Sequence, residues 1–321
     1  MSGVPDGDNL PRHGSKIAII GAGFVGSTSA YACLIDGAAS EIALIDASRE
    51  KAEGEAMDLR HGLPFKPNSR IEFGNDYRLC KDADIVVICA GAHQKQNETR
   101  LDLVSRNAAI FRQMIPSITK HNKECILLVV SNPLDVLTYL TLKYSKFPKN
   151  RVFGSGTILD TARFRFLLGE HFGVSPNSVH AYILGEHGDS SFPVWSSANV
   201  AGVPLRQLRK YNKRKMGEIY LKTKNAAYEV IARKGATYYA IGLGVAKIVR
   251  SILSDQNDVL ALSSYLKNYH GVSEICLSVP AVVNRNGIKE QIILPLNSLE
   301  KRQLRKSANV INGIIKGCAN C

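Results

Sequence analysis

The sequence predicts an α/β fold in which a doubly wound parallel sheet is followed by an α+β region with antiparallel strands and long helices. From Lys16 onward, short β-branched runs alternate with amphipathic stretches, which is typical of parallel strands covered by helices on both faces. Apolar residues make up 45% of the 321 residues, enough to fill a large core. The pattern changes after about Phe153, so we expect a domain boundary near residue 155.

The first region, residues 16–155, is expected to be a dinucleotide-binding domain that follows a flexible leader over residues 1–15. Its strands are almost continuously apolar and so suit burial on both faces. We expect them at Ile17–Ile20, Ile42–Ile45, Ile85–Cys89 and Ile126–Val130. Helical periodicity predicts helices at about 24–37, 48–62 and 101–122.

The second region, residues 156–321, is expected to be the substrate domain. The sequence predicts a helix over Leu159–Phe172, a strand near Val179–Leu184, a helical tract from about Lys213 to Leu253 interrupted by Gly235, and a final helix from about Ser298 to Ile315. Alternating runs at 274–283 and 289–294 flank a turn over Asn284–Gly287, which predicts an antiparallel hairpin.

Charge and cysteine usage narrow the functional classes. The net charge of +13, densest at Arg206–Lys215, favours either nucleic acid or small anionic substrates; since no nucleic-acid module accompanies the run, we expect a solvated helix face and no nucleic-acid partner. No run of about 18 apolar residues predicts a membrane span.

Seven cysteines, an odd number, lie mostly in apolar runs, which indicates buried thiols in the cytoplasm. No cluster with zinc-ligand spacing is complete, so no metal is expected.

The segment Gly21–Gly26 (GAGFVG) directly follows the first predicted strand. Its glycines allow a tight turn and close approach of a pyrophosphate to the N–H groups at the helix start. Asp46 ends the next strand, 20 residues beyond Gly26, where a carboxylate accepts hydrogen bonds from a ribose diol and repels a 2′-phosphate. The alternative is a glycine turn in a plain α/β fold, but the combined spacing favours a Rossmann-type site for NAD over NADP.

A second motif, Gly185–Asp189, places His187 in a glycine-flanked turn after an apolar run. Near neutral pH, histidine suits both giving and taking a proton, as required when a hydride and a proton meet at one carbonyl. Asp160 and Arg163 lie three residues apart on a predicted helix, so their side chains share a face. The pair alone is more simply a surface salt bridge, but together with His187 a catalytic interpretation is favoured.

These motifs and several others occur in the order found in NAD-dependent L-lactate dehydrogenases, which the sequence resembles from about Lys16 to the final helix. The other matching segments are Gly91–Gln94, Glu98–Arg100, Ser131–Asp135, Gly154–Thr157, Leu159–Arg163 and Gly235–Tyr239. The resemblance implies the lactate/malate dehydrogenase fold, NAD as cofactor, pyruvate or L-lactate as substrate and a homotetramer. It is strongest to the bacterial type that fructose 1,6-bisphosphate activates.

The resemblance also implies the binding residues. Those for NAD are Gly21, Gly23, Val25, Gly26, Asp46, Lys51, Tyr77, Gly91, Ala92, Ser105, Val130, Asn132, Ser155 and Ile241, the last against the nicotinamide. Lys51 and Tyr77 also suit ordinary surface or packing roles.

In the implied chemistry, His187 is the proton donor and acceptor and Asp160 orients it. Arg163 grips the substrate carboxylate with two parallel hydrogen bonds. Arg100 ends a polar stretch that resembles the family's mobile lid, and with Asn132 it stabilises charge on the reacting oxygen.

Two positions bear on the choice of substrate. Malate-specific relatives have an arginine where this sequence has Gln94, and a second substrate carboxylate needs that cation because burying it unpaired is costly. Gln94 and Thr237 therefore favour pyruvate. The lid also has Gln96-Asn97 where many relatives have a glycine turn; Asn tolerates left-handed backbone, so lid closure is still expected.

A second anion site is also implied. Arg165 lies about 200° around the helix from Arg163, so it faces away from the active site. In fructose 1,6-bisphosphate-activated enzymes, the residues that match Arg165 and His180 bind the activator's phosphate between subunits. The alternative is an exposed arginine and a histidine with ordinary hydrogen-bond partners.

Two other functions stay open at this point. One is a malate or other 2-hydroxy-acid dehydrogenase, which Gln94 disfavours. The other is a catalytically silent NAD-binding regulator or nucleic-acid partner that uses the basic run. A catalytically inactive protein is disfavoured because a pure binding protein has no need of proton-transfer residues. This sequence has a full set of them, in His187, Asp160, Arg163 and Arg100.

Overall fold

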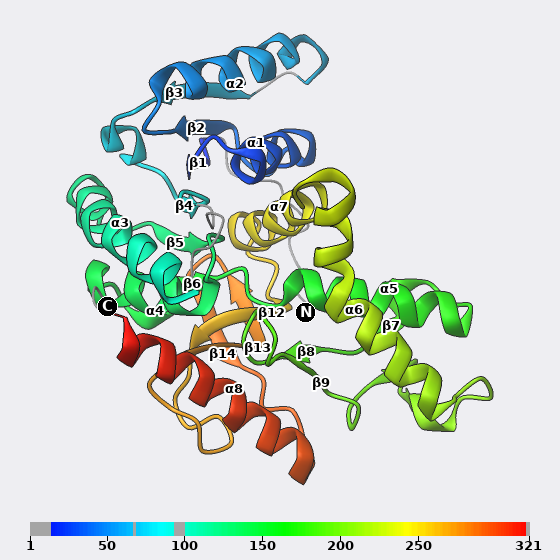
Figure 1. The fold of residues 1–321 in the computed structure, drawn as a ribbon. Helices are drawn as coiled ribbons and strands as arrows, with labels where there is room; N and C mark the ends of the chain where they lie inside the picture. Colours follow the sequence, from blue (N-terminus) through cyan, green and yellow to red (C-terminus); the bar gives the residue numbers. More distant parts are fainter. Residues whose placement is uncertain (1–13, 67–68, 93–99, 319–321) are drawn as a thin grey trace, which may run out of the picture.

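A nine-stranded sheet forms the centre of the computed structural model, which describes residues 14–66, 69–92 and 100–318 (Figure 1). The strand order is β14-β13-β12-β6-β5-β4-β1-β2-β3. The parallel strands are β1 Lys16–Ile20, β2 Glu41–Ile45, β3 Arg70–Gly74, β4 Ile85–Ile88, β5 Ile126–Val129 and β6 Val152–Gly154. The antiparallel strands β12 Asp258–Tyr265, β13 Cys276–Asn284 and β14 Gly287–Gln291 extend the same sheet beyond β6. Strand order reverses direction at β1, between β2 and β4, which is where doubly wound folds bind ligands.

Helices cover both faces of this sheet. Because successive strand residues point to opposite faces, Ile17 and Ile19 pack into one core and Ala18 and Ile20 into the other. The first core is covered by α1 Phe24–Asp36, α2 Arg49–His61 and α7 Tyr239–Leu253, and the second by α3 Arg100–His121, α4 Leu134–Ser145 and α8 Ser298–Gly317. This two-sided burial explains why the strands are apolar at nearly every position.

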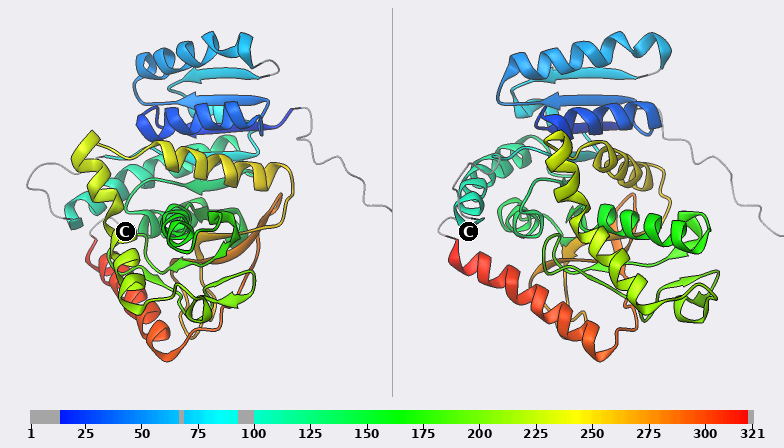
Figure 2. Two further views of the ribbon diagram at one scale, coloured as in Figure 1. Left: turned by 90° about the vertical axis from the view of Figure 1, so that its right-hand side faces the viewer. Right: turned by 45° about the vertical axis from the view of Figure 1, so that its right-hand side comes forward.

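A third apolar cluster lies beside the sheet, where α5 Ile158–Phe172 packs on α6 Lys213–Lys234. Short strands border it: β7 Val179–His180, β8 Ile183–Leu184, β9 Phe192–Pro193, β10 Asn199–Val200 and β11 Val203–Pro204. Short 3₁₀ turns occur at Leu63–Phe65, Tyr77–Cys80, Lys149–Arg151, Pro176–Ser178 and Leu205–Gln207. Figure 2 shows α2 and β3 at one end of the molecule and α8 at the other.

The structure confirms the predicted strands and helices of the first region to within one or two residues, but β3, β6 and α4 of that region were missed, as was β12 of the second region. The edge strand β3 buries only one large side chain, Ile71, β6 has only three residues, and β12 ends in polar Ser-Ser-Tyr. Helix α4 is buried on most of its surface, so its sequence lacks the polar face that marks a helix. The single strand predicted near Val179–Leu184 is wrong: β7 pairs with β10 and β8 with β9, so the chain breaks between them.

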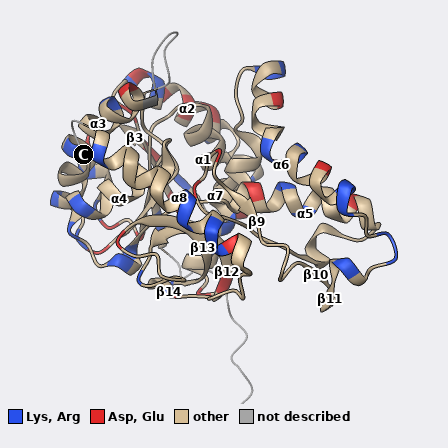
Figure 3. Cartoon of the chain, turned by 60° about the horizontal axis from the view of Figure 1, so that its bottom comes forward, with Lys and Arg blue, Asp and Glu red and all other residues tan. Residues whose placement is uncertain are grey.

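Basic residues are spread over many elements rather than gathered on one face (Figure 3). In the dense run, Arg214 and Lys215 both pair with Glu218 on α6, as expected of a solvated helix face. No helix in the described part of the chain is long and apolar enough to cross a membrane.

Candidate active site

The glycine turn after β1 is built by close backbone contacts. Gly21 has φ +99°, and a Cβ there would lie 2.7 Å from the amide nitrogen of Ala90. A Cβ on Gly26 would collide with the carbonyl oxygen of Gly21. No other residue fits at either position without moving the backbone, so the predicted need for glycine has a direct steric cause.

The turn presents first-turn N–H groups of α1 that have no side-chain acceptor, next to the hydrogen-bonded carboxylate of Asp46. Gly23 caps α1 but provides no side-chain acceptor for the first-turn N–H groups. The Asp46 carboxylate accepts hydrogen bonds from the N–H groups of Ala22 at 2.7 Å and Ser48 at 3.0 Å, which ties the turn to the end of β2. Tyr77 lies close by: burial raises its pKa, and electrostatic interaction with Cys80 and Asp46 raises it further. This arrangement of open helix N-terminus, close glycines and adjacent carboxylate fits the pyrophosphate and ribose of NAD.

A buried asparagine joins two loops at the carboxyl edge of the sheet. The Asn107 side chain on α3 accepts a hydrogen bond from the Ala92 N–H at 2.7 Å and donates to the Asn132 carbonyl at 3.0 Å. Asn132 precedes Pro133 through a cis peptide bond, and its side chain is exposed at the start of α4. The loop that contains Ala92 and the loop with Asn132 are thereby held together.

The loop with His187 is fixed through its main chain by several surrounding elements. Gly185 exchanges two backbone hydrogen bonds with Ser278 of β13, and the Glu186 N–H donates to Ser307 Oγ of α8 at 2.6 Å. The His187 N–H donates to the Asp135 carboxylate of α4 at 2.7 Å. Main-chain anchoring of this kind places the imidazole with little freedom.

Helix α5 presents a carboxylate to both of the expected partners. Asp160 Oδ2 lies 2.7 Å from His187 Nδ1, and Asp160 Oδ1 lies 3.3 Å from Arg163 Nη1. The three side chains are 16–28% exposed, so they are enclosed but reachable. Burial on its own lowers the pKa of His187, but the Asp160 charge and hydrogen bond outweigh it and the net pKa is raised. Burial likewise raises the pKa of Asp160, yet His187 and Arg163 together lower it overall.

The structure places the remaining predicted residues as follows. Val130 and Ser155 are buried at the ends of β5 and β6, and Val25, on α1, is half-buried. Ile241 of α7 and Ile158 of α5 both lie within 4.0 Å of where a Cβ on Gly244 would be. Lys51 is exposed on α2, its amine 3.8 Å from where a Gly23 Cβ would lie; Gly91 adjoins Asn107; Thr237 is half-exposed between α6 and α7. Ser105 instead contacts Cys318 Sγ, at 3.8 Å. Gln94, Gln96 and Asn97 lie outside the described residues, and Arg100 is the first residue of α3.

Arg165 of α5 is hydrogen-bonded to the segment that follows His180. Arg165 Nε donates to the Ala181 carbonyl at 2.9 Å, and its guanidinium lies 4.8 Å from the centre of the Tyr182 ring. His180 is exposed on β7, next to Ala181. Arg165 is therefore held against the residue that directly follows His180 in the chain.

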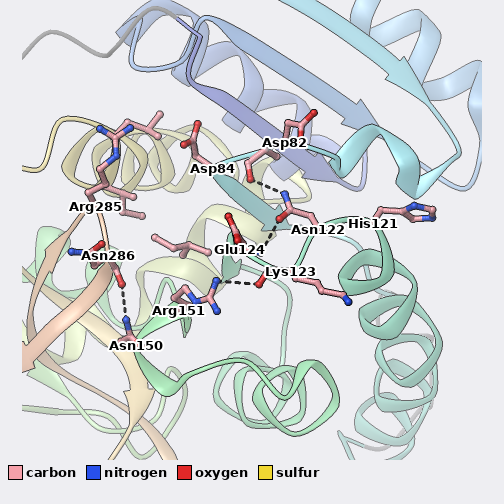
Figure 4. Close-up of a pocket in the computed structure, with 14 residues that line it drawn as sticks. Asp82, Asp84, His121, Asn122, Lys123, Glu124, Asn150, Arg151, Arg285 and Asn286 are labelled. Carbon is pink, nitrogen blue, oxygen red and sulfur yellow. Dashed lines mark hydrogen bonds between the residues drawn. The ribbon is translucent and has the colours of Figure 1, made fainter.

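A separate cavity of about 890 Å³ lies at the opposite, amino-terminal edge of the sheet (Figure 4). Its polar lining includes Asp84 before β4, Glu124 before β5, Arg151 and Arg285. The lining carries both signs of charge and none of the predicted site residues. Within the described segments, no group of three or more His, Cys, Asp or Glu is placed to hold a metal.

Comparison with known proteins decides the family. The model of the lactate/malate dehydrogenase NAD-binding domain matches residues 15–154, and that of the family's α/β C-terminal domain matches residues 157–320. The chain belongs to the lactate/malate dehydrogenase family. It is thus an NAD-dependent dehydrogenase, which confirms the predicted family, cofactor and fold class.

Similar proteins of this family match nearly the whole chain. An L-lactate dehydrogenase of Acetivibrio thermocellus is 52% identical over 94% of this chain and 96% of its own length, and one of Bacillus caldotenax is 49% identical over the same shares. Among solved structures, a lactate dehydrogenase from a Medee basin deep-sea metagenome library superposes with a TM-score of 0.92 at 43% identity, covering 95% of this chain and 99% of its own. The minor L-lactate dehydrogenase of Enterococcus mundtii gives 0.92 at 42% identity, covering 95% and 98%.

Sequence reasoning missed the residues that hold the site together. Asp135, Asn107 and Ser307 lie in helices far from His187 along the chain, and each accepts a hydrogen bond from the main chain of a loop that carries predicted residues. Asp135 alone gave a usable signal: an acidic residue in an apolar helix, just after the Asn-Pro turn. For the other two, nothing in the sequence distinguishes them from ordinary polar positions.

Proposed function

We propose that this protein is an L-lactate dehydrogenase that reversibly reduces pyruvate to L-lactate. The observation that carries the proposal is the Asp160 carboxylate between His187 and Arg163, at 2.7 and 3.3 Å. One carboxylate thus orients both a proton donor and a carboxylate-binding group. The proposal agrees with the names of relatives that are about half identical over 94% of the chain.

The proposed mechanism assigns each side chain one task. NADH, when bound, supplies the hydride to the keto carbon. Arg163 binds the substrate carboxylate through guanidinium N–H groups. His187 Nδ1 donates to Asp160, which leaves Nε2 to protonate the reacting oxygen. Asn132 and Arg100 stabilise the negative charge that develops on that oxygen.

We propose pyruvate over oxaloacetate because Gln94 and Thr237 provide no cation for a second carboxylate. The test is steady-state kinetics on both keto acids, following NADH absorbance. The unmodified enzyme should strongly prefer pyruvate, and Gln94→Arg should shift the preference toward oxaloacetate. Comparable kcat/KM values of the unmodified enzyme on the two acids would instead support the alternative, a malate or broader 2-hydroxy-acid dehydrogenase.

We also propose a homotetramer that fructose 1,6-bisphosphate activates through Arg165 and His180. Large apolar side chains on the outer faces of α1 and α7 support assembly: Phe24 and Leu243 are each 68% exposed, and Tyr31 and Ile35 each 55%. The contacts of Arg165 with the Tyr182 ring and with the carbonyl of Ala181, the residue after His180, support an anion site there.

Pyruvate titrations with and without the sugar bisphosphate test this activation. The activator should lower the KM for pyruvate and increase the tetramer fraction in sedimentation, and Arg165→Gln should abolish both effects. An unchanged KM over a wide range of activator would refute the site.

A cytoplasmic location is proposed from the cysteines. Cys33, Cys80, Cys125 and Cys276 are buried free thiols, and burial raises the pKa of each, which keeps them unreactive.

A further inference from the structure

A second buried carboxylate adjoins His187, and the mechanism above does not use it. Asp135 is 1% exposed in the first turn of α4, three residues after Asn132. Its Oδ2 accepts the His187 N–H at 2.7 Å, and its Oδ1 accepts the Ser263 hydroxyl of β12 at 2.6 Å. One side chain therefore joins the loop of the proton donor, the helix behind Asn132 and the central sheet.

Among the described residues, the imidazole of His187 is the cation whose charge acts on Asp135. The charged or titratable groups near this pair are Asp160 and Arg163 on α5, Tyr220 on α6 near Asp160, Lys224 on α6 bound to the Asp189 carbonyl, Glu186 in the loop, Cys276 on β13 and Lys149 near Cys276. Arg163 pairs with Asp160, and Lys224 with Asp189. His187 is thus the group whose positive charge Asp135 can stabilise.

Holding this carboxylate ionised is unfavourable for the fold. Burial raises the pKa of Asp135 to about 6, although the hydrogen bonds from Ser263 and His187 oppose the rise. A neutral asparagine would satisfy the same backbone N–H without that cost, because its amide oxygen accepts as a carboxylate oxygen does. Unlike an amide, the carboxylate accepts from both His187 and Ser263, and it places a negative charge beside His187.

We propose that Asp135 is a positioning residue of the proton-transfer site, which fixes the main chain of His187 and adds a negative charge that favours the protonated imidazole. The inference rests on the proposed role of His187 in proton transfer. In this arrangement Asp160 orients the ring through Nδ1, while Asp135 acts from the main-chain side of the same residue. Two carboxylates on two helices then keep one buried imidazole protonated near neutral pH.

The test compares Asp135→Asn with the unmodified enzyme over a range of pH. The variant retains the acceptor for the His187 N–H but loses the charge, so the pH above which kcat/KM for pyruvate declines should move down by about half a unit or more. At pH 8 the loss should be about three- to tenfold, with little change at pH 6. A merely structural role would lower activity equally at all pH values.

A second measurement follows His187 without catalysis. Diethyl pyrocarbonate acylates neutral imidazole, so the pH dependence of labelling at the His187 peptide, read by mass spectrometry in the enzyme alone, gives the pKa of this residue. Asp135→Asn should shift this curve to lower pH. If the enzyme proves not to reduce pyruvate, the proposed function fails, while the labelling curve still tests Asp135.

Glu186→Gln is the matched control. Glu186 is also 1% exposed and neighbours His187 in sequence, but its carboxylate accepts hydrogen bonds from Ser190. This variant should leave the labelling curve in place. An unshifted curve in Asp135→Asn, or an equal shift in both variants, would overturn the proposal.

Discussion

The glycine turn and the proton-transfer cluster lie at neighbouring parts of one sheet edge, yet they are built in opposite ways. The turn is made by main chain from a single six-residue segment, and its requirements are steric: Gly26 faces the Gly21 carbonyl. The cluster brings together Asp135, Asp160 and His187 from three separate segments. His187 donates one hydrogen bond from its main chain to Asp135 and one from its ring to Asp160. The comparison teaches that the cofactor turn depends on local shape, whereas the proposed proton transfer depends on charges brought together from distant segments.

The largest effect should come from filling the turn. Gly26→Ala places a Cβ against the Gly21 carbonyl oxygen, so the turn must move and NADH affinity should fall at least about 100-fold, as judged by fluorescence titration. Gly54→Ala on α2 is the control: a Cβ there meets no atom within 4 Å, so binding should be unchanged and stability slightly increased. Equal NADH affinity in the two variants would show that the turn does not depend on steric fit.

Removing the shared carboxylate should affect chemistry and spare the cofactor. Asp160→Asn leaves burial to lower the pKa of His187, and Arg163 loses its partner, so kcat/KM for pyruvate at pH 7.5 should fall about 100-fold, within the range of acid–base effects. NADH affinity should remain. Asp258→Asn, which breaks an ion pair with Lys247 far from the site, serves as control and should cost stability but not turnover. A parallel loss of NADH binding in Asp160→Asn would remove the distinction between the two regions.

The smallest predicted effect is the response to pH. The pKa of His187 is raised above 6.5, so kcat/KM for pyruvate should stay constant through neutral pH and then decline about tenfold per pH unit above that raised value.

The free energy of unfolding should also depend on pH. His187 contributes fully to it below pH 6.5, and this contribution is lost as pH rises through the raised pKa. Asp160, whose pKa is lowered, contributes above about pH 3.8 and loses its effect as pH falls through the lowered value. A kcat/KM profile that declines below pH 6.5 would contradict this assignment.

The same contrast explains how much the sequence could predict. The strands at β1, β2, β4 and β5 and the glycine turn were predicted because their signals are local: continuous apolar runs and fixed glycine spacing. The proximity of Asp160 to His187 was expected from motif order in a family, not from spacing, since 27 residues separate them.

What the sequence did not indicate depends on tertiary packing. Helix α4 was missed because it is largely buried and so has no polar face. For the same reason the contact of Asp135 with His187 was not predicted. Asn107 was missed because its partners, Ala92 and Asn132, are main-chain groups, and main-chain groups leave no trace in a sequence. Residues that position a site through the backbone become visible only when the fold is known.

The most direct test of the account is NADH oxidation by pyruvate in the unmodified enzyme and in His187→Asn, measured together with NADH binding by fluorescence. The account predicts that the variant binds NADH as well as the unmodified enzyme while its turnover falls by about 10²–10⁴-fold. Turnover of the variant within a few-fold of the unmodified enzyme would contradict the assignment of His187 as the proton donor.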